Sequence, residues 1–262
     1  MKTIFIVLSV IAAIVIVLGG IFYTSFLMAG PLATLVIDSG NVQYKSAGDW
    51  QDASSGMSLK QDYSVKTLEN SAAKIIFSNS VMRLDANTEI ALSNLDASSV
   101  SIAQIAGKTW SKVLKISGIS DYEVSTPDAI ATVRGTAFDI EVGNGTKIGV
   151  AEGNVTAQVN GTNVQEIIGA NMQATINSGD SQINEVELLL DAWINSNIEK
   201  DTQYREELKA KLKSKYSFLL NIAKSQNDIS DDEVNKLIDE WLDGKISIKK
   251  AIADGSIPSS MA

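Results

Sequence analysis

The residue types that most often do chemistry in proteins are unevenly available in this chain. None of its 262 residues is a cysteine or a histidine, so a thiol nucleophile, a Ser-His triad, a disulfide and a zinc site with the usual nitrogen and sulfur ligands are excluded. Catalysis would have to rest on carboxylates, hydroxyls or amines. Ser71 with Lys74, and Ser247 with Lys250, have a Ser-Lys spacing that some acyl transferases use on one helical face. Ser71 precedes a predicted strand, so it would not share a helical face with Lys74, and the match is best explained by chance. We assign no catalytic residue, cofactor or metal ligand.

The charge of the chain bears on its partners. With 22 basic and 31 acidic side chains its formal net charge is −9. Nucleic-acid affinity depends largely on lysines and arginines that displace counterions from phosphates. We therefore expect no nucleic-acid partner.

Three side chains are candidates for modification. Asn144, Asn154 and Asn160 each begin an Asn-x-Thr sequon at a predicted turn, where a glycosylation acceptor must be exposed. The tripeptide is also common by chance in a chain rich in Asn, Ser and Thr. Glycosylation is therefore a hypothesis for these sites.

A long apolar segment precedes every element that could carry these side chains. Residues 4–22 are interrupted only by Ser9 and the pair Gly19-Gly20, and apolar character continues to Met28. About 20 apolar residues are enough for a helix to cross a bilayer. A cleavable signal peptide is the alternative, but its apolar region is usually about 7 to 15 residues long. We predict a transmembrane signal anchor over residues 1–30, in contact with lipid through residues 4–28.

The few charges near this segment set its orientation. Lys2 and the amino terminus precede the apolar run, and the first charge after it is the acidic Asp38. By the positive-inside rule the amino terminus is cytoplasmic, and the residues after about 30 are extracytoplasmic. The expected location is the cell membrane, in single-pass form.

The region from residue 34 to 180 has the pattern of an all-β domain. Short runs of Val, Ile, Thr and Ala are separated by turn pairs such as Asn160-Gly161. The fold could be a sandwich, a barrel or a solenoid. Apolar and polar residues alternate most clearly in two runs, whose apolar members are Ala73, Ile75 and Phe77 and then Val155, Ala157 and Val159.

The region from residue 184 to 262 changes to a helical period. Val186, Leu189, Leu190 and Trp193 have helical spacing, and Asn184 with Glu187 forms a candidate capping box in front of them. A second helix is predicted over about 202–224. A third is predicted to begin at Ser230, where Glu233 completes a Ser-x-x-Glu box, and to end at Gly244, with a short turn at 247–253. These helices would form a small bundle.

One stretch of the β region resembles a known family. The sequence from Tyr122 to Val142 contains a Thr-Pro pair followed by Val-Arg-Gly-Thr-x-Phe, and it is similar to the central signature of the FecR domain. The resemblance covers about residues 35–160 and implies a twisted, solenoid-like β fold outside a membrane. The signature residues, with a structural or partner-binding role, are Thr126, Pro127, Val133, Arg134, Gly135, Thr136 and Phe138.

The chain departs from the best-known FecR proteins at both ends. Those regulators carry a cytoplasmic anti-sigma segment before the membrane helix, and only residues 1–3 would be cytoplasmic here. They also commonly end in a small α/β signalling module, whereas residues 184–262 are predicted to be helical. The resemblance therefore supports the domain and its topology, but neither sigma-factor control nor iron sensing.

Arg134 has two alternative placements. If residues 130–142 formed one strand, Arg134 would share a face with Phe138 and would need buried acceptors such as Asp128, Asp139 or backbone carbonyls. Alternatively, Gly135 introduces a bulge that turns Arg134 outward. We favour a buried structural role, which predicts that Arg134→Ala lowers the melting temperature by several degrees. A role in partner binding is the alternative.

These observations predict a membrane-anchored, extracytoplasmic FecR-like module. Its expected function is non-enzymatic: it binds a protein or a glycan at the cell envelope and acts in signalling or as a scaffold. One alternative is a carboxylate-based hydrolase of envelope polysaccharide, which requires two carboxyl groups about 5 to 10 Å apart in a groove. Another is regulation in trans of a separate signalling membrane protein.

Overall fold

The structure is a computed structural model that describes residues 33–115, 119–215, 217 and 230–245. The predicted signal anchor, the part of the second predicted helix beyond 217, and the turn at 247–253 lie outside these residues. Neither described helix is both long enough and apolar enough to span a bilayer.

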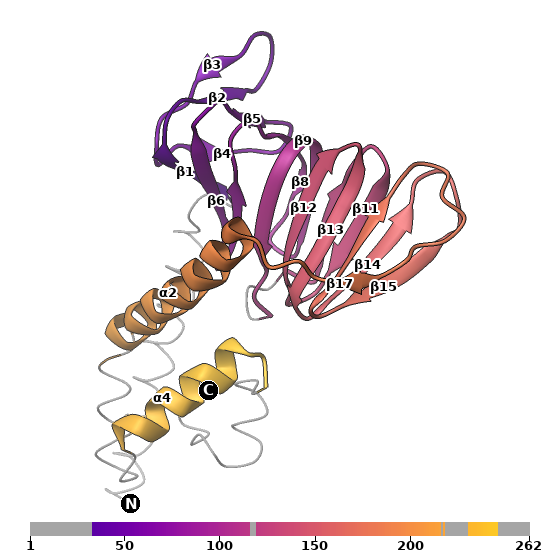
Figure 1. Ribbon diagram of the computed structural model, residues 1–262. Helices are drawn as coiled ribbons and strands as arrows, with labels where there is room; N and C mark the ends of the chain where they lie inside the picture. Colours follow the sequence, from indigo (N-terminus) through magenta and orange to yellow (C-terminus); the bar gives the residue numbers. More distant parts are fainter. Residues whose placement is uncertain (1–32, 116–118, 216, 218–229, 246–262) are drawn as a thin grey trace, which may run out of the picture. The chain divides into compact units, whose positions relative to one another are not determined.

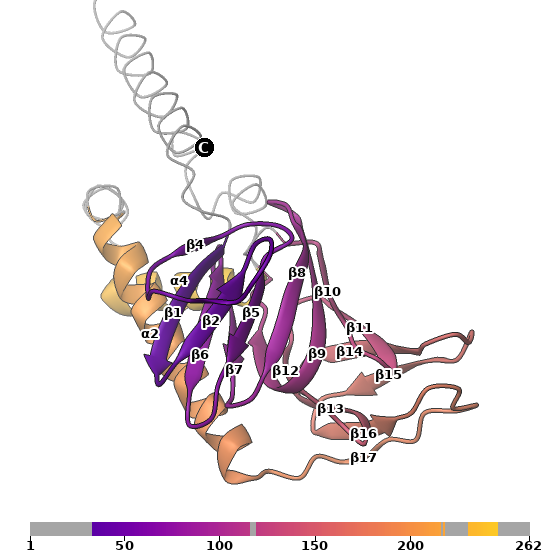
Figure 2. The same cartoon turned by 90° about the horizontal axis from the view of Figure 1, so that it is seen from above.

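The described part is mainly β, as predicted, and its seventeen strands lie in two layers that share the long strand β9 (Ser99–Lys112) (Figures 1 and 2). Layer A comprises, in spatial order, β17 (Val186–Glu187), β16 (Met172–Ile176), β13 (Gly145–Glu152), β12 (Ala137–Gly143), the second half of β9, β7 (Ser80–Leu84), β6 (Ala72–Phe77), β1 (Ala33–Ser39) and β4 (Ser58–Leu59). Layer B comprises β3 (Gln51–Asp52), β2 (Val42–Lys45), β5 (Ser64–Thr67), β8 (Glu89–Leu95), the first half of β9, β10 (Asp121–Ser125), β11 (Ala129–Val133), β14 (Asn154–Val159) and β15 (Gln165–Gly169).

The chain passes back and forth between these layers, mostly as hairpins. The hairpins β6–β7 and β12–β13 lie in layer A, and β10–β11 and β14–β15 lie in layer B. All pairings are antiparallel except that of β9 with β10. Strand order in each layer therefore follows chain order closely, which is the solenoid-like arrangement that the FecR resemblance implies.

The alternating side chains of the strands fill the space between the layers. Ala73, Ile75 and Phe77 of β6 are buried, as are the alternate apolar residues of β14, so both predicted alternations are confirmed. At the centre, the Tyr122 ring meets Phe77 and Phe138 edge to face, with ring centroids 6.3 Å apart in each pair. The Tyr122 hydroxyl is hydrogen-bonded to Ser111 Oγ at 3.0 Å. Burial raises the pKa of Tyr122 far above its usual value, so this hydroxyl stays neutral.

Three of the crossings between layers, at Gly40, Gly107 and Gly153, share one local arrangement. A glycine with a positive φ makes the turn, and a serine or threonine hydroxyl from a neighbouring crossing bonds the backbone of the next residue. Gly107, with φ +83°, is followed by Lys108, whose N–H donates to Thr88 Oγ1 at 3.0 Å. A Cβ on Gly107 would lie 2.5 Å from Thr88 Cα, so no other residue fits this corner. The Ser71 hydroxyl accepts from Asn41 N–H at a similar corner, which gives Ser71 a structural role rather than one in a Ser-Lys pair.

The helical region differs from the prediction at its start. Val186 and Glu187 form β17 rather than the first turn of a helix, because they pair with β16. The helix α2 (Ala192–Lys215) then replaces the first two predicted helices. Its N-cap is Asp191, whose carboxylate accepts from Ile194 N–H at 2.7 Å, so the predicted Asn184 cap is wrong.

The last described helix is as the sequence predicts. Helix α4 (Asp231–Leu242) begins after Ser230, whose hydroxyl accepts from Glu233 N–H at 3.2 Å while the Glu233 carboxylate accepts from Ser230 N–H at 2.9 Å. This is the predicted capping box. The helix ends just before Gly244, which has φ +66°.

Candidate functional site

The Thr-Pro part of the signature joins several turns of the solenoid. Thr126 Oγ1 lies 2.8 Å from Thr146 Oγ1, and Thr146 donates to Asp128 Oδ2 at 3.0 Å. The other oxygen of Asp128 accepts from the N–H and the hydroxyl of Ser178. These bonds connect the β10–β11 turn, the β12–β13 turn and the turn that follows β16. The Thr-Pro part of the signature therefore has a structural role.

The rest of the signature forms one crossing between layers. Val133 and Phe138 are buried in the core, and Gly135 turns the chain with φ +70°. Thr136 is also buried, and its hydroxyl donates to the Asn154 carbonyl at 2.9 Å. The signature is thus largely a scaffold motif.

Arg134 is the exception. It is exposed, and within the part of the chain that the structure describes it makes no hydrogen bond or ion pair. The favoured interpretation of a buried, paired Arg134 is therefore wrong: β11 ends at Val133, and Gly135 turns Arg134 outward before β12 begins. The Lys115 side chain lies against Gly135, so a second cation is close to this turn.

The three sequons differ in how available their asparagine side chains are. Asn144 and Asn154 are exposed. Asn160 is half-buried, and its amide donates to the carbonyls of Thr126 at 2.9 Å and Pro127 at 3.0 Å. A glycan on Asn160 would have to break those bonds, so Asn144 and Asn154 are the more accessible acceptors.

A second group of polar residues attaches α2 to the outer face of layer A. Arg83 on β7 forms a buried ion pair with Asp201 on α2, with Nη1 and Oδ1 2.5 Å apart. The other oxygen of Asp201 accepts from Trp110 Nε1 at 2.9 Å. Burial raises the pKa of Asp201, while Arg83 and Trp110 oppose that effect. A buried pair of this kind favours one docked position of α2.

A lysine fastens the segment just before α2. Lys108 on β9 donates to Asp191 at 3.1 Å, lies 3.9 Å from the Glu141 carboxylate, and sits 4.6 Å from the centre of the Trp193 ring. Burial acts to raise the pKa of Asp191, but the hydrogen bonds from Ile194 and Lys108 outweigh it and hold that pKa below its usual value. Asp191 is therefore both helix cap and anchor.

Asp139 on β12 is a buried carboxylate close to Leu188, in the segment that precedes α2. It is 0% exposed, and neither carboxylate oxygen has a hydrogen-bond partner among the described residues. A Cβ on Gly149 of β13 would lie 2.3 Å from Asp139 Oδ1 and 2.7 Å from Leu188 Cδ1, so the carboxylate occupies space that this glycine leaves beside Leu188. Burial raises the pKa of Asp139 from 3.8 to about 7, against the opposing effect of Lys108 and Lys147.

A cavity of about 330 Å³ lies between layer A and the helices. Its lining includes two carboxylates, Glu152 and Asp201, as a polysaccharide hydrolase would require. Both are already paired with cations, Glu152 with Lys112 and Asp201 with Arg83. In the described part of the chain, no cluster of three or more carboxylates is placed to hold a metal ion. The cavity therefore has no free acid and base pair.

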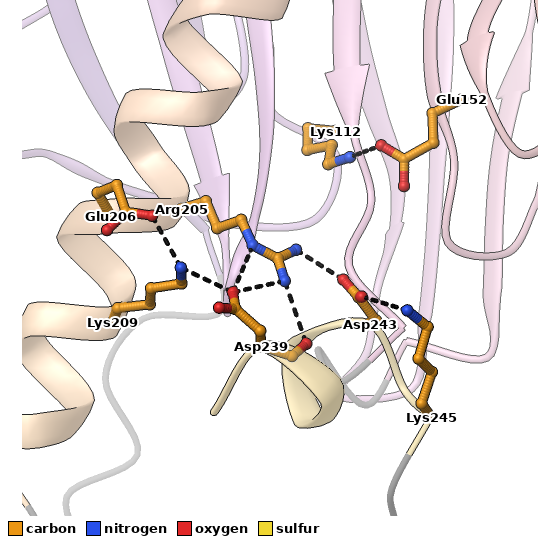
Figure 3. A network of polar contacts seen from close by, with 8 residues as sticks. All are labelled: Lys112, Glu152, Arg205, Glu206, Lys209, Asp239, Asp243 and Lys245. Atoms are coloured by element: carbon orange, nitrogen blue, oxygen red, sulfur yellow. Dashed lines mark hydrogen bonds and ion pairs between the residues drawn. The ribbon is translucent and has the colours of Figure 1, made fainter. Parts of the chain in front are cut away.

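Ion pairs also connect the two helices (Figure 3). Arg205 of α2 contacts Asp239 at 2.9 Å and Asp243 at 2.7 Å on and after α4, and Lys209 contacts Asp239 at 2.7 Å. Burial acts to raise the pKa of Asp239 and of Asp243, but hydrogen bonds from the neighbouring cations outweigh it and lower both. The network holds α4 against α2.

The comparison with family models matches the region that contains the signature. Residues 63–156 match the family model described as FecR protein. The FecR resemblance predicted for about residues 35–160 is thereby confirmed over this range, which contains the whole Thr-Pro and Val-Arg-Gly-Thr signature.

Solved structures add a weaker likeness. Two crystal structures, at 1.65 and 2.50 Å resolution, of an anti-sigma-factor candidate from Parabacteroides distasonis each align at 15% identity with a TM-score of 0.41. Each alignment covers 48% of this chain and 59% of the other, so this chain spans less than two thirds of those proteins. The comparison with curated proteins gave no match.

Sequence reasoning did not find the contact between α2 and layer A. Arg83 and Asp201 are 118 positions apart, and no local pattern relates them. Asp139 was considered only as a partner for Arg134. Its place between Phe138 and Ile140, in an apolar run on β12, was the one signal in the sequence that it is buried.

Proposed function

We propose that this chain is a non-enzymatic binding module that regulates or transmits a signal at the cell envelope. The observation that carries the proposal is the exposure of Arg134 within a stretch of the signature whose neighbours Val133, Thr136 and Phe138 are buried. An arginine that supports the fold would be held by carbonyls or carboxylates, and Arg134 has no such partner among the described residues. The FecR match over residues 63–156 supports a regulatory role.

The chemistry of Arg134 indicates what it would bind. A guanidinium group presents its N–H donors in a planar fork that fits carboxylates in pairs. The nearby Lys115 adds a second positive charge beside Gly135. A carboxylate of a partner protein, or of an acidic glycan, fits this pair of cations.

The envelope location is part of the proposal and rests on the sequence. Residues 4–28 would hold the chain in the membrane, with residues after about 30 on the extracytoplasmic side. Protease treatment of intact cells is expected to degrade the FecR region. Survival of that region, with degradation after lysis, would contradict the topology.

Comparison of Arg134→Ala with Lys60→Ala tests the binding role. Both residues are exposed cations, but Lys60 lies outside the matched region. Partner recovery from solubilised envelope is expected to fall with Arg134→Ala and to be unchanged with Lys60→Ala. Because Arg134 is exposed, its variant should also melt within about 1 °C of wild type.

Two results would contradict the proposal. One is equal partner recovery by both variants. The other is a fall of several degrees in the melting temperature of Arg134→Ala, which would return Arg134 to a structural role.

A further inference from the structure

The two layers end in open strand edges on the same side of the fold. Within the described residues, β15 pairs only with β14, and β17 pairs only with β16. The segment between β16 and β17 makes no backbone hydrogen bond to β15. Unpaired edges are templates for another strand, and soluble proteins usually protect them with lysines, prolines or a covering element.

The charge of this end is of one sign. Residues 148–199 contain seven acidic side chains and no lysine or arginine. Five of these acids make no ion pair among the described residues: Glu166, Asp180, Glu185 and Glu187, and Glu199 on α2. A cationic ligand would therefore meet several uncompensated carboxylates here.

The same end exposes apolar side chains. Of the six large hydrophobic residues that are exposed in the described part, four lie between β15 and the start of α2. They are Ile167 (57% exposed), Val186 (55%), Leu189 (67%) and Leu190 (54%). Ile167 lies on the edge strand of layer B, and the other three lie on or after the edge strand of layer A, so both open edges carry exposed apolar side chains.

We propose that β15 binds an extended segment of a partner protein in which lysines or arginines alternate with apolar residues. The segment would add to layer B as a new antiparallel or parallel strand, with its apolar residues against Ile167 and its cations near Glu166. A second copy of this chain does not fit, because two such acidic ends repel each other. The inference rests on the proposed function in assuming a protein partner, but it does not involve Arg134.

Hydrogen exchange with peptide probes tests the strand. The full-length chain in detergent is mixed with an alternating lysine-valine octapeptide, with a glutamate-valine octapeptide, or with a lysine-valine peptide interrupted by proline. Only the first can both form a strand and match the charge. We expect slower exchange of residues 165–169 with the first peptide alone.

Charge-reversal variants test the partner chemistry. Glu166→Lys combined with Glu187→Lys is expected to weaken binding of the lysine-valine peptide at least about fivefold at low ionic strength. The matched control, Asp49→Lys combined with Glu69→Lys, reverses two exposed acids elsewhere on the chain and should change affinity less than about twofold.

Several outcomes would overturn the inference. They are equal protection by the proline-interrupted peptide, protection only outside residues 165–169, absence of binding, and equal effects of the two double variants. Loss of partner recovery with Arg134→Ala together with any of these results would leave the proposed function intact and remove only the strand.

Discussion

The burial of Asp139 predicts how its contribution to the free energy of unfolding depends on pH. Its carboxylate is fully buried without a hydrogen-bond partner among the described residues, and its pKa is raised from 3.8 to about 7. In the unfolded chain Asp139 ionises near its usual pKa, so between these two values the folded state binds more protons. The contribution of Asp139 to stability is therefore fully present below about pH 4 and is lost as the pH rises toward 7.

The size of the effect follows from the two pKa values. The pKa difference between the folded and unfolded states is about 3, and each pKa unit corresponds to about 1.4 kcal/mol. Ionisation of Asp139 therefore lowers the free energy of unfolding by at most about 4 kcal/mol at pH 8. Asp139→Asn keeps the shape and cannot ionise. An unpaired amide has its own cost of about 1 to 3 kcal/mol, but that cost does not change with pH.

Urea unfolding between pH 5 and pH 8 measures the difference between Asp139→Asn and wild type. We expect this difference in unfolding free energy to change by roughly 3 kcal/mol over that range in favour of the variant as the pH rises. Glu166→Gln is the control, because Glu166 is exposed on β15 in the other layer and makes no ion pair among the described residues. The difference in unfolding free energy between this variant and wild type should not change with pH. A flat difference for Asp139→Asn would refute the assignment of an unpaired buried carboxylate.

Two further predictions concern the same contact. Gly149→Ala places a Cβ against Asp139 and Leu188 and should cost about 2 kcal/mol in denaturant unfolding, whereas Gly143→Ala, with open space around it, should cost less than about 0.5 kcal/mol. Equal losses of unfolding free energy for the two variants would show that a Cβ at residue 149 meets no close neighbour. Adding Asp139→Ala to Gly149→Ala should restore part of the lost unfolding free energy. Arg83→Met leaves Asp201 buried without its partner and should cost about 3 kcal/mol or more, and Asp201→Leu added to it should recover most of that. If the double variant is no more stable than Arg83→Met in the same unfolding assay, the ion pair does not explain the docking of α2.

The sequence predicts those parts of the fold that depend on local patterns. The alternation in β6 and β14 follows from the two-residue period of a strand with one buried face. The start of α4 follows from the Ser230 and Glu233 capping box, whose hydrogen bonds lie within one turn. The FecR signature was recognisable because its residues stand close together in one stretch, from Thr126 to Phe138.

Errors arose where tertiary contacts compete with a local pattern. The helical spacing of Val186 and Leu189 coincides by chance with a segment that pairs with β16, so the strand replaced the predicted helical turn. Arg134 was placed by extending strand alternation across Gly135, where the chain leaves one layer for the other. The pairing of Arg83 with Asp201 joins positions 118 apart in the chain, so it could not be predicted from spacing.

The measurement that tests the central claim most directly is site-specific photo-cross-linking in intact cells. A photoreactive residue replaces Arg134 in one variant and the exposed Lys60 in another, and the envelope is illuminated before solubilisation. A binding role for the Arg134 turn predicts a discrete covalent adduct from position 134 and none from position 60. Absence of any adduct at position 134, with the variant folded and present in the envelope, would contradict that role.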